Sequence, residues 1–115
     1  MALATDLAIY HDAYELLTLT TKLTGQYHRN FRDLARDIRA EATAVVKSIY
    51  TANCTRDKAP AIQRLREHLG TLQLFFRLST DLRQISPGQF GSTVKLTTAV
   101  SKQATGWLNY AKARA

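Results

Sequence analysis

Apolar residues recur at three- and four-residue steps in four successive stretches of this chain, and this spacing predicts four amphipathic α-helices. The stretches cover residues 6–24, 31–53, 58–85 and 87–112, so the connections between them are short. Each helix would be about 27–40 Å long at 1.5 Å per residue. Because short links between long helices make neighbouring helices antiparallel, the sequence predicts an all-α, up-down-up-down antiparallel four-helix bundle.

Several residues at the ends of these stretches are typical of helix caps. Ser86 and Gln89 are spaced as a capping box at the start of the fourth stretch. Asn30 is expected to cap the second helix, and Asp6 or Thr5 the first. In the first helix, the face predicted to point into the bundle carries Tyr10, Ala13, Tyr14, Leu17 and Thr21.

Length and composition place all four helices in a single domain, residues 1–115. A chain of 115 residues with 45% apolar residues can build one core and is too short for two. No apolar run approaches the ~20 residues that a membrane-spanning helix needs, so no membrane partner is expected. No signal-peptide pattern is present at the start, and one cysteine cannot form an intrachain disulfide. We therefore expect a cytoplasmic protein.

The chain is strongly basic, with 16 Lys+Arg against 9 Asp+Glu, a net charge of +7 and a pI near 9.9. The cations are unevenly distributed. Residues 86–115 contain Lys95, Lys102, Lys112 and Arg114 and no acidic residue. Such a protein attracts polyanions, among which nucleic acid is the commonest inside a cell. The alternative is a basic surface that is merely solvated.

Five cations follow one side of the second helix. At roughly 100° per residue they fall within a sector of about 80°, and they are Arg29, Arg32, Arg36, Arg39 and Lys47. The acidic residues of this helix, Asp33, Asp37 and Glu41, fall on the opposite flank. Arginine binds phosphate with two parallel hydrogen bonds, so this stripe, extended by Arg56 and Lys58, is predicted to bind a nucleic-acid backbone without base specificity. Two alternatives are a solvated face whose arginines pair locally and a docking surface for an acidic protein.

The third helix carries more apolar residues than two neighbours in a bundle can cover. Beyond its main stripe, the excess consists of Leu74 and of four residues assigned to an interface, Phe75, Leu78, Leu82 and Ile85. A helix that is apolar over most of its circumference is buried on most sides. We therefore expect these four residues to contact a second copy of the chain, with a wide internal core as the alternative.

The sequence contains no arrangement of residues typical of a catalytic or metal site. His11, His28 and His68 stand alone, and no Gly-rich phosphate loop is present. We expect no catalytic residues, no metal and no cofactor. One weak alternative is that Arg64 and His68 are similar to the Arg…His pair of helical ribonucleases of the HEPN superfamily, although that pair has a longer spacing.

A further set of residues, spread from about Leu7 to Trp107, resembles a known family. It comprises Tyr10 and Tyr14, the run Ile49–Asn53, Arg77-Leu78, Asp81-Leu82, Gln103 and Gly106-Trp107. In this order they resemble the accessory variability determinant proteins of diversity-generating retroelements. These are related to four-helix-bundle proteins of ribosomal-RNA intervening sequences. The latter usually end their second helix with an Asn-Ile-Ala-Glu-Gly type of motif, whereas this chain has Thr51-Ala52-Asn53-Cys54-Thr55, which favours the retroelement branch.

The resemblance implies a noncatalytic accessory protein that assembles as a homopentameric, ring-like barrel. It implies binding to the reverse transcriptase of the same element and to RNA, with DNA as a further candidate ligand. The complex would support mutagenic cDNA synthesis and retrohoming. The alternative function is that of a protein-binding assembly factor of the intervening-sequence type.

Overall fold

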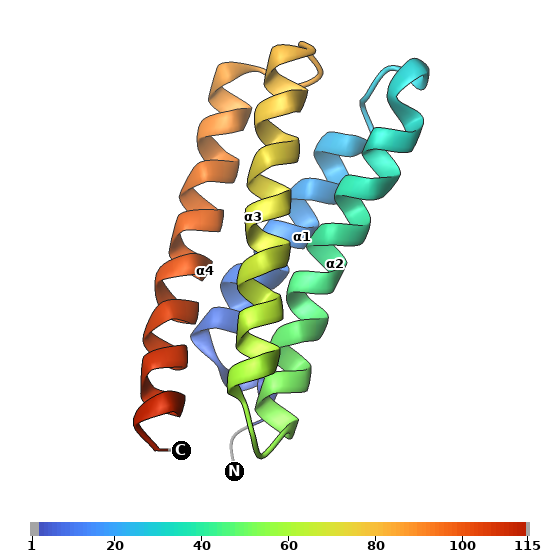
Figure 1. Cartoon of the computed structure of the whole chain (residues 1–115). Helices are drawn as coiled ribbons and strands as arrows, with labels where there is room; N and C mark the ends of the chain where they lie inside the picture. Colours follow the sequence, from blue (N-terminus) through green and yellow to red (C-terminus); the bar gives the residue numbers. More distant parts are fainter. Residues whose placement is uncertain (1–2, 115) are drawn as a thin grey trace.

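In the computed structural model, which describes residues 3–114, four long helices form an antiparallel bundle (Figure 1). They are α1 (Ala8–Thr24), α2 (Arg32–Cys54), α3 (Ala59–Asp81) and α4 (Pro87–Ala113), with short 3₁₀ helices η1 (Ala4–Asp6) and η2 (Arg29–Phe31). Each helix contacts the next one along the chain, and α4 returns to contact α1. The described part of the chain has no strand. The predicted all-α, up-down-up-down bundle is thus confirmed; residues 1, 2 and 115 of the predicted domain lie outside the described residues.

The core is built from one face of every helix. On α2, α3 and α4 most buried residues recur at three- and four-residue steps, and they include Ile38, Val45, Leu65, Leu72 and Val100. Removing each of these side chains from water stabilises the fold by roughly 1.5–3 kcal/mol before the loss of conformational entropy is counted.

The buried face of α1 differs from the predicted one. It carries Ile9, Ala13, Leu16, Thr20, Leu23 and Thr24. Tyr14, expected inside, is 55% exposed, and Thr21 is also exposed. Apolar side chains occur on most sides of α1, so its spacing fits two adjacent faces. Packing against α2 and α4 selects the face with the aliphatic residues.

Buried threonine hydroxyls are satisfied within their own helices. Thr20 donates to the Leu16 carbonyl at 2.7 Å, and Thr24 donates to the Thr20 carbonyl at 2.7 Å. On α4, Thr97 donates in the same way to the Thr93 carbonyl at 2.9 Å. These residues therefore enter the core without leaving a polar atom unpaired, despite their modest helix propensity.

The helix starts confirm one predicted cap and correct two. At α4 the Ser86 side chain accepts from the Gln89 N–H at 3.1 Å, and the Gln89 side chain accepts from the Ser86 N–H at 2.8 Å. The predicted cap of α1 is wrong, because Thr5 and Asp6 lie in η1 and Leu7 precedes the helix without a side-chain cap.

The predicted cap of α2 at Asn30 is also wrong. Asn30 lies inside η2, and its N–H donates to the imidazole Nδ1 of His28 at 3.1 Å. The extra turn of 3₁₀ helix cannot be recognised in the sequence because its residues continue the helical spacing of α2. The same loop is held to the α3–α4 loop, since the His28 N–H donates to Gln84 Oε1 at 2.8 Å.

The end of α3 also differs from the prediction of residue 85. The helix ends at Asp81, and Arg83 adopts a left-handed conformation with φ of 60°. The Gln84 N–H donates to the Ser79 carbonyl at 2.9 Å and the Arg83 N–H to the Thr80 carbonyl at 3.0 Å, the two bonds of a Schellman motif. Glycine usually occupies this position, so its absence hides the end of the helix in the sequence.

Replacing Arg83 by glycine is expected to stabilise the protein by about 1 kcal/mol, because a non-glycine residue is strained in the left-handed region. Urea unfolding followed by circular dichroism measures the change. The matched control is Arg77→Gly, which removes the same charge from an exposed position inside α3 and should destabilise by about 1 kcal/mol. Equal destabilisation by both variants would show that Arg83 carries no such strain.

Candidate nucleic-acid interface

The cations of α2 lie on its outer surface. Arg29, Arg32, Arg36 and Lys47 are exposed, and Arg39 is half-buried. Arg36 contacts Asp33 at 3.4 Å, but their side chains are 70% and 88% exposed, so water screens this ion pair. Arg29 lies in η2, and the other four cations lie on α2, whose 23 residues span about 35 Å.

Three of these arginines surround one depression, the α1–α2 hollow, at the junction of the two helices. Arg29, Arg32 and Arg39 line a volume of about 290 Å³ together with Thr24, Gly25, Tyr27 and Ala35. No acidic residue is among these lining residues. The arrangement concentrates positive charge where a phosphate could be contacted from more than one side.

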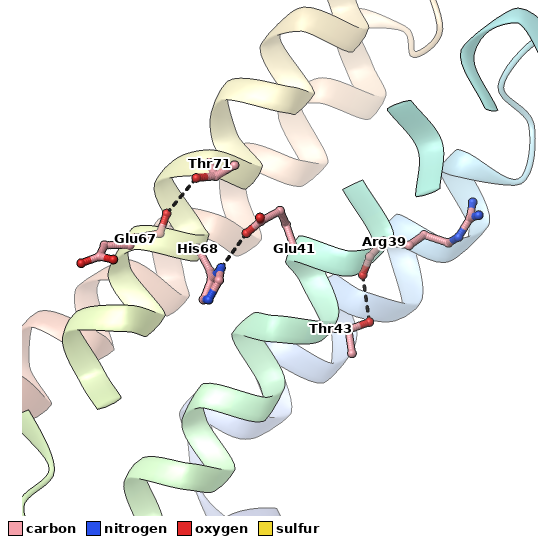
Figure 2. A network of polar contacts seen from close by, with 6 residues as sticks. All are labelled: Arg39, Glu41, Thr43, Glu67, His68 and Thr71. Atoms are coloured by element: carbon pink, nitrogen blue, oxygen red, sulfur yellow. Dashed lines mark hydrogen bonds and ion pairs between the residues drawn. The ribbon is translucent and has the colours of Figure 1, made fainter. Parts of the chain in front are cut away.

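Lys47 contributes to a different depression, the α2–α3 hollow, of about 210 Å³. Arg64 and His68 of α3 line it from the other side, with Ala44, Ser48 and Thr51. The His68 imidazole Nδ1 lies 2.7 Å from Glu41 Oε2, which joins α3 to α2 (Figure 2). Arg39 projects away from this pair (Figure 2), so the cations of α2 serve two sides of the helix.

The third depression, the terminal hollow, lies at the α2–α3 turn beside the end of α4. Its volume is about 540 Å³, and its lining residues are Arg56, Asp57, Lys58, Tyr110, Ala111 and Arg114. Arg56 is exposed here, as its predicted role requires.

Lys58, predicted to extend the phosphate-binding surface, makes its hydrogen bonds within the chain. Its ammonium donates to the carbonyls of Ala52 at 2.9 Å, Asn53 at 3.2 Å and Thr55 at 3.0 Å. An ammonium has three N–H donors, and these bonds use all of them. Lys58 therefore caps the C-terminus of α2, where a cation is also favoured by the helix dipole. The sequence alone could not show that the turn folds back over these carbonyls.

The four residues predicted to contact a second copy lie in three different environments. Leu78 and Leu82 are 41% and 36% exposed, and Leu74, also exposed, extends the same side of α3. Phe75 is half-buried against the core. Ile85 is only 5% exposed and belongs to the core, so its assignment to an interface is wrong. The end of α3 explains the error, since the Schellman turn directs Ile85 inward.

The His, Cys, Asp and Glu side chains are dispersed over the bundle. Within residues 3–114, no group of three or more His, Cys, Asp or Glu side chains could hold a metal ion. Among the same residues, no helix combines the length and apolar character needed to cross a membrane.

The sequence did not predict that tyrosines, or residues of α3, would line these hollows beside the cations. The sequence pattern links Arg64 only to catalysis. It allows the five tyrosines to stack on bases but singles out neither Tyr27 nor Tyr110, and it gives Arg114 no binding role. The spacing of Tyr110 and Arg114, one helical turn apart, could have indicated their contact. The approach of α4 to the α2–α3 turn depends on packing that no local pattern shows.

No protein-family model matches the sequence, and no curated protein is significantly similar to it. The resemblance to accessory variability determinant proteins therefore stays a prediction, as do the nucleic-acid contacts of the cations.

Tyr27, in the wall of the α1–α2 hollow, carries a buried hydroxyl without a well-formed hydrogen bond among the described residues. The neighbouring Ser79 hydroxyl already donates to the Phe75 carbonyl at 2.8 Å. Burial raises the pKa of the Tyr27 phenol from its ordinary value of 10.0, and Ser79 offsets part of the rise. The folded protein thus holds this proton to higher pH than the unfolded chain does.

We therefore expect the free energy of unfolding to fall as the pH rises above 10, because there the unfolded chain loses a proton that the folded protein keeps. Tyr27→Phe removes this contribution and should make the alkaline fall shallower. Urea unfolding at several pH values between 8 and 11 measures the effect. Tyr50→Phe, at an exposed tyrosine of α2, is the matched control and should leave the slope unchanged. Identical slopes in both variants would contradict the role of Tyr27.

Proposed function

We propose that this protein is a noncatalytic scaffold that binds RNA through the basic surface of α2. The observation that carries the proposal is the series of cation-lined hollows along this helix, from Arg29 and Arg32 at one end to Arg56 at the other. Cations of this kind bind phosphate groups, and such contacts do not depend on the base sequence of the nucleic acid. The net charge of +7 supports the same ligand class.

We further propose that the scaffold is the accessory protein of a diversity-generating retroelement. Its partner would be the reverse transcriptase of that element, which the protein would hold beside RNA, or DNA, during mutagenic cDNA synthesis and retrohoming in the cytoplasm. The sequence resemblance supports this assignment. A ring-like homopentamer belongs to the same proposal and is supported by the exposed leucines of α3, Leu74, Leu78 and Leu82.

Neutralising the arginines in pairs tests RNA binding. Arg29→Gln/Arg32→Gln removes two cations from the α1–α2 hollow and should weaken binding, and the salt slope should fall by about one for each phosphate that the variant no longer binds. Arg36→Gln/Arg39→Gln should have a smaller effect, because only Arg39 of this pair lines the α1–α2 hollow. Fluorescence anisotropy with a labelled RNA at several KCl concentrations gives both quantities.

The control pair for this experiment is Arg66→Gln/Arg77→Gln, which removes the same charge from exposed positions of α3. Its salt slope should stay close to that of the unmodified protein. If all three pairs lower affinity equally, net charge alone explains binding and the α2 surface has no special role.

A second candidate function, RNA cleavage, is favoured by the contact between His68 and Glu41. A carboxylate 2.7 Å from an imidazole can orient it as a general base. Arg64, which lines the same hollow, could bind the phosphate of the cleaved bond. The same contact also has a purely structural use, since it joins α2 to α3.

Incubation of a labelled RNA with the protein separates these two functions, and we expect the RNA to stay intact. Cleavage that is abolished by His68→Ala and by Arg64→Gln would replace the scaffold proposal with an enzyme. Gel electrophoresis of the RNA after incubation provides the measurement, and a preparation of His68→Ala made in parallel controls for contaminating ribonucleases.

A further inference from the structure

The terminal hollow has the size and the lining of a site for a small planar ligand. Its volume of about 540 Å³ falls within the range of roughly 300–1,000 Å³ that is typical of ligand sites. It is formed where the α2–α3 turn meets the last turns of α4, at the end of the bundle where α4 finishes (Figure 1).

One wall of the hollow is formed by two planar groups in contact. The Tyr110 side chain is 57% exposed, and the guanidinium carbon of Arg114 lies 4.6 Å from the centre of its ring. A guanidinium and an aromatic ring stack well on each other and on other π systems. Nucleic-acid bases have such π faces, and exposed aromatic side chains bind them by stacking.

The charge of the hollow favours an anionic ligand. Arg56, Lys58 and Arg114 supply three cations against the single carboxylate of Asp57. The N–H groups of Lys58 are occupied by α2 carbonyls, so this residue supplies charge and no hydrogen bond to a ligand. Arg56 is exposed and forms no ion pair within residues 3–114, which leaves its guanidinium available for a phosphate.

We propose that the terminal hollow binds one unpaired nucleotide of a single-stranded nucleic acid. The base stacks on the Tyr110–Arg114 pair, and Arg56 contacts the adjoining phosphate. This inference rests on the proposed function for its ligand class and adds a preference that the α2 surface does not provide. Phosphate contacts alone do not distinguish paired from unpaired strands, whereas stacking on a side chain requires a base whose face is free.

The test compares three labelled probes of equal length: single-stranded oligouridylate, a single strand with abasic sugars, and a duplex RNA. Tyr110→Ala should weaken binding of the oligouridylate by about tenfold and leave the other two probes nearly unchanged. Tyr110→Phe keeps a ring able to stack and should retain most of the affinity. Tyr14→Ala removes a comparably exposed tyrosine from α1, outside the hollow, and serves as the matched control.

Two results would overturn the inference. One is unchanged binding of oligouridylate by Tyr110→Ala, with circular dichroism showing that the variant is folded. The other is an equal loss on all three probes, since this would assign Tyr110 no contact with a base.

The Arg29→Gln/Arg32→Gln pair, measured on the same probes, separates this inference from the proposed function. Weaker binding of all three probes by the arginine pair supports the α2 surface. A selective effect of Tyr110→Ala without any effect of the arginine pair supports the terminal hollow and overturns the α2 surface. The reverse pattern overturns the terminal hollow alone.

Discussion

The inward packing of α2 is the constraint on which the surface of this protein depends. Ile38, Val45 and Ile49 are fully buried and fix the rotation of the helix about its axis. Once these side chains face the core, Arg36 and Lys47, on the opposite side of the helix, must face water. A helix has no freedom to turn its cations inward without exposing its apolar stripe, so the basic surface follows directly from the core.

The sequence predicted the features that one helix determines by itself and failed where two segments meet. The buried face of α2 was predictable because its apolar and charged residues are cleanly separated. The face of α1 was not, because Tyr14 and Leu16 lie on different sides of a helix that has apolar residues on most sides. The end of α3 was missed because Arg83 occupies a position usually held by glycine. Ile85, placed on an interface by helical spacing, is directed into the core by that turn.

In the α2–α3 turn, two cations of similar type, Arg56 and Lys58, lie in different environments. Arg56 and Lys58 are two residues apart and are equivalent as phosphate contacts by sequence alone. Lys58 donates to three carbonyls at the end of α2, and its short distances to them leave no donor for a ligand. Arg56 has no such acceptors and stays exposed. The last turn of a helix has carbonyls without partners inside the helix, and the folded turn places Lys58 beside them. The spacing of charges along the chain does not show this placement.

The hollows also suggest how a small, rigid bundle can combine two kinds of recognition. In the proposed function, cations on the outer surface of α2 would act at a distance and on any phosphate, so they would favour capture of a polyanion without selecting it. The Tyr110–Arg114 pair acts only at contact, and a base must leave its own stack to reach it. Because the terminal hollow lies at the end of α2, where Arg56 follows the helix, a strand held along that surface would bring its unpaired nucleotides to the ring. In the proposed binding mode, the cations along α2 provide affinity for any strand. The terminal hollow provides the preference for unpaired strands.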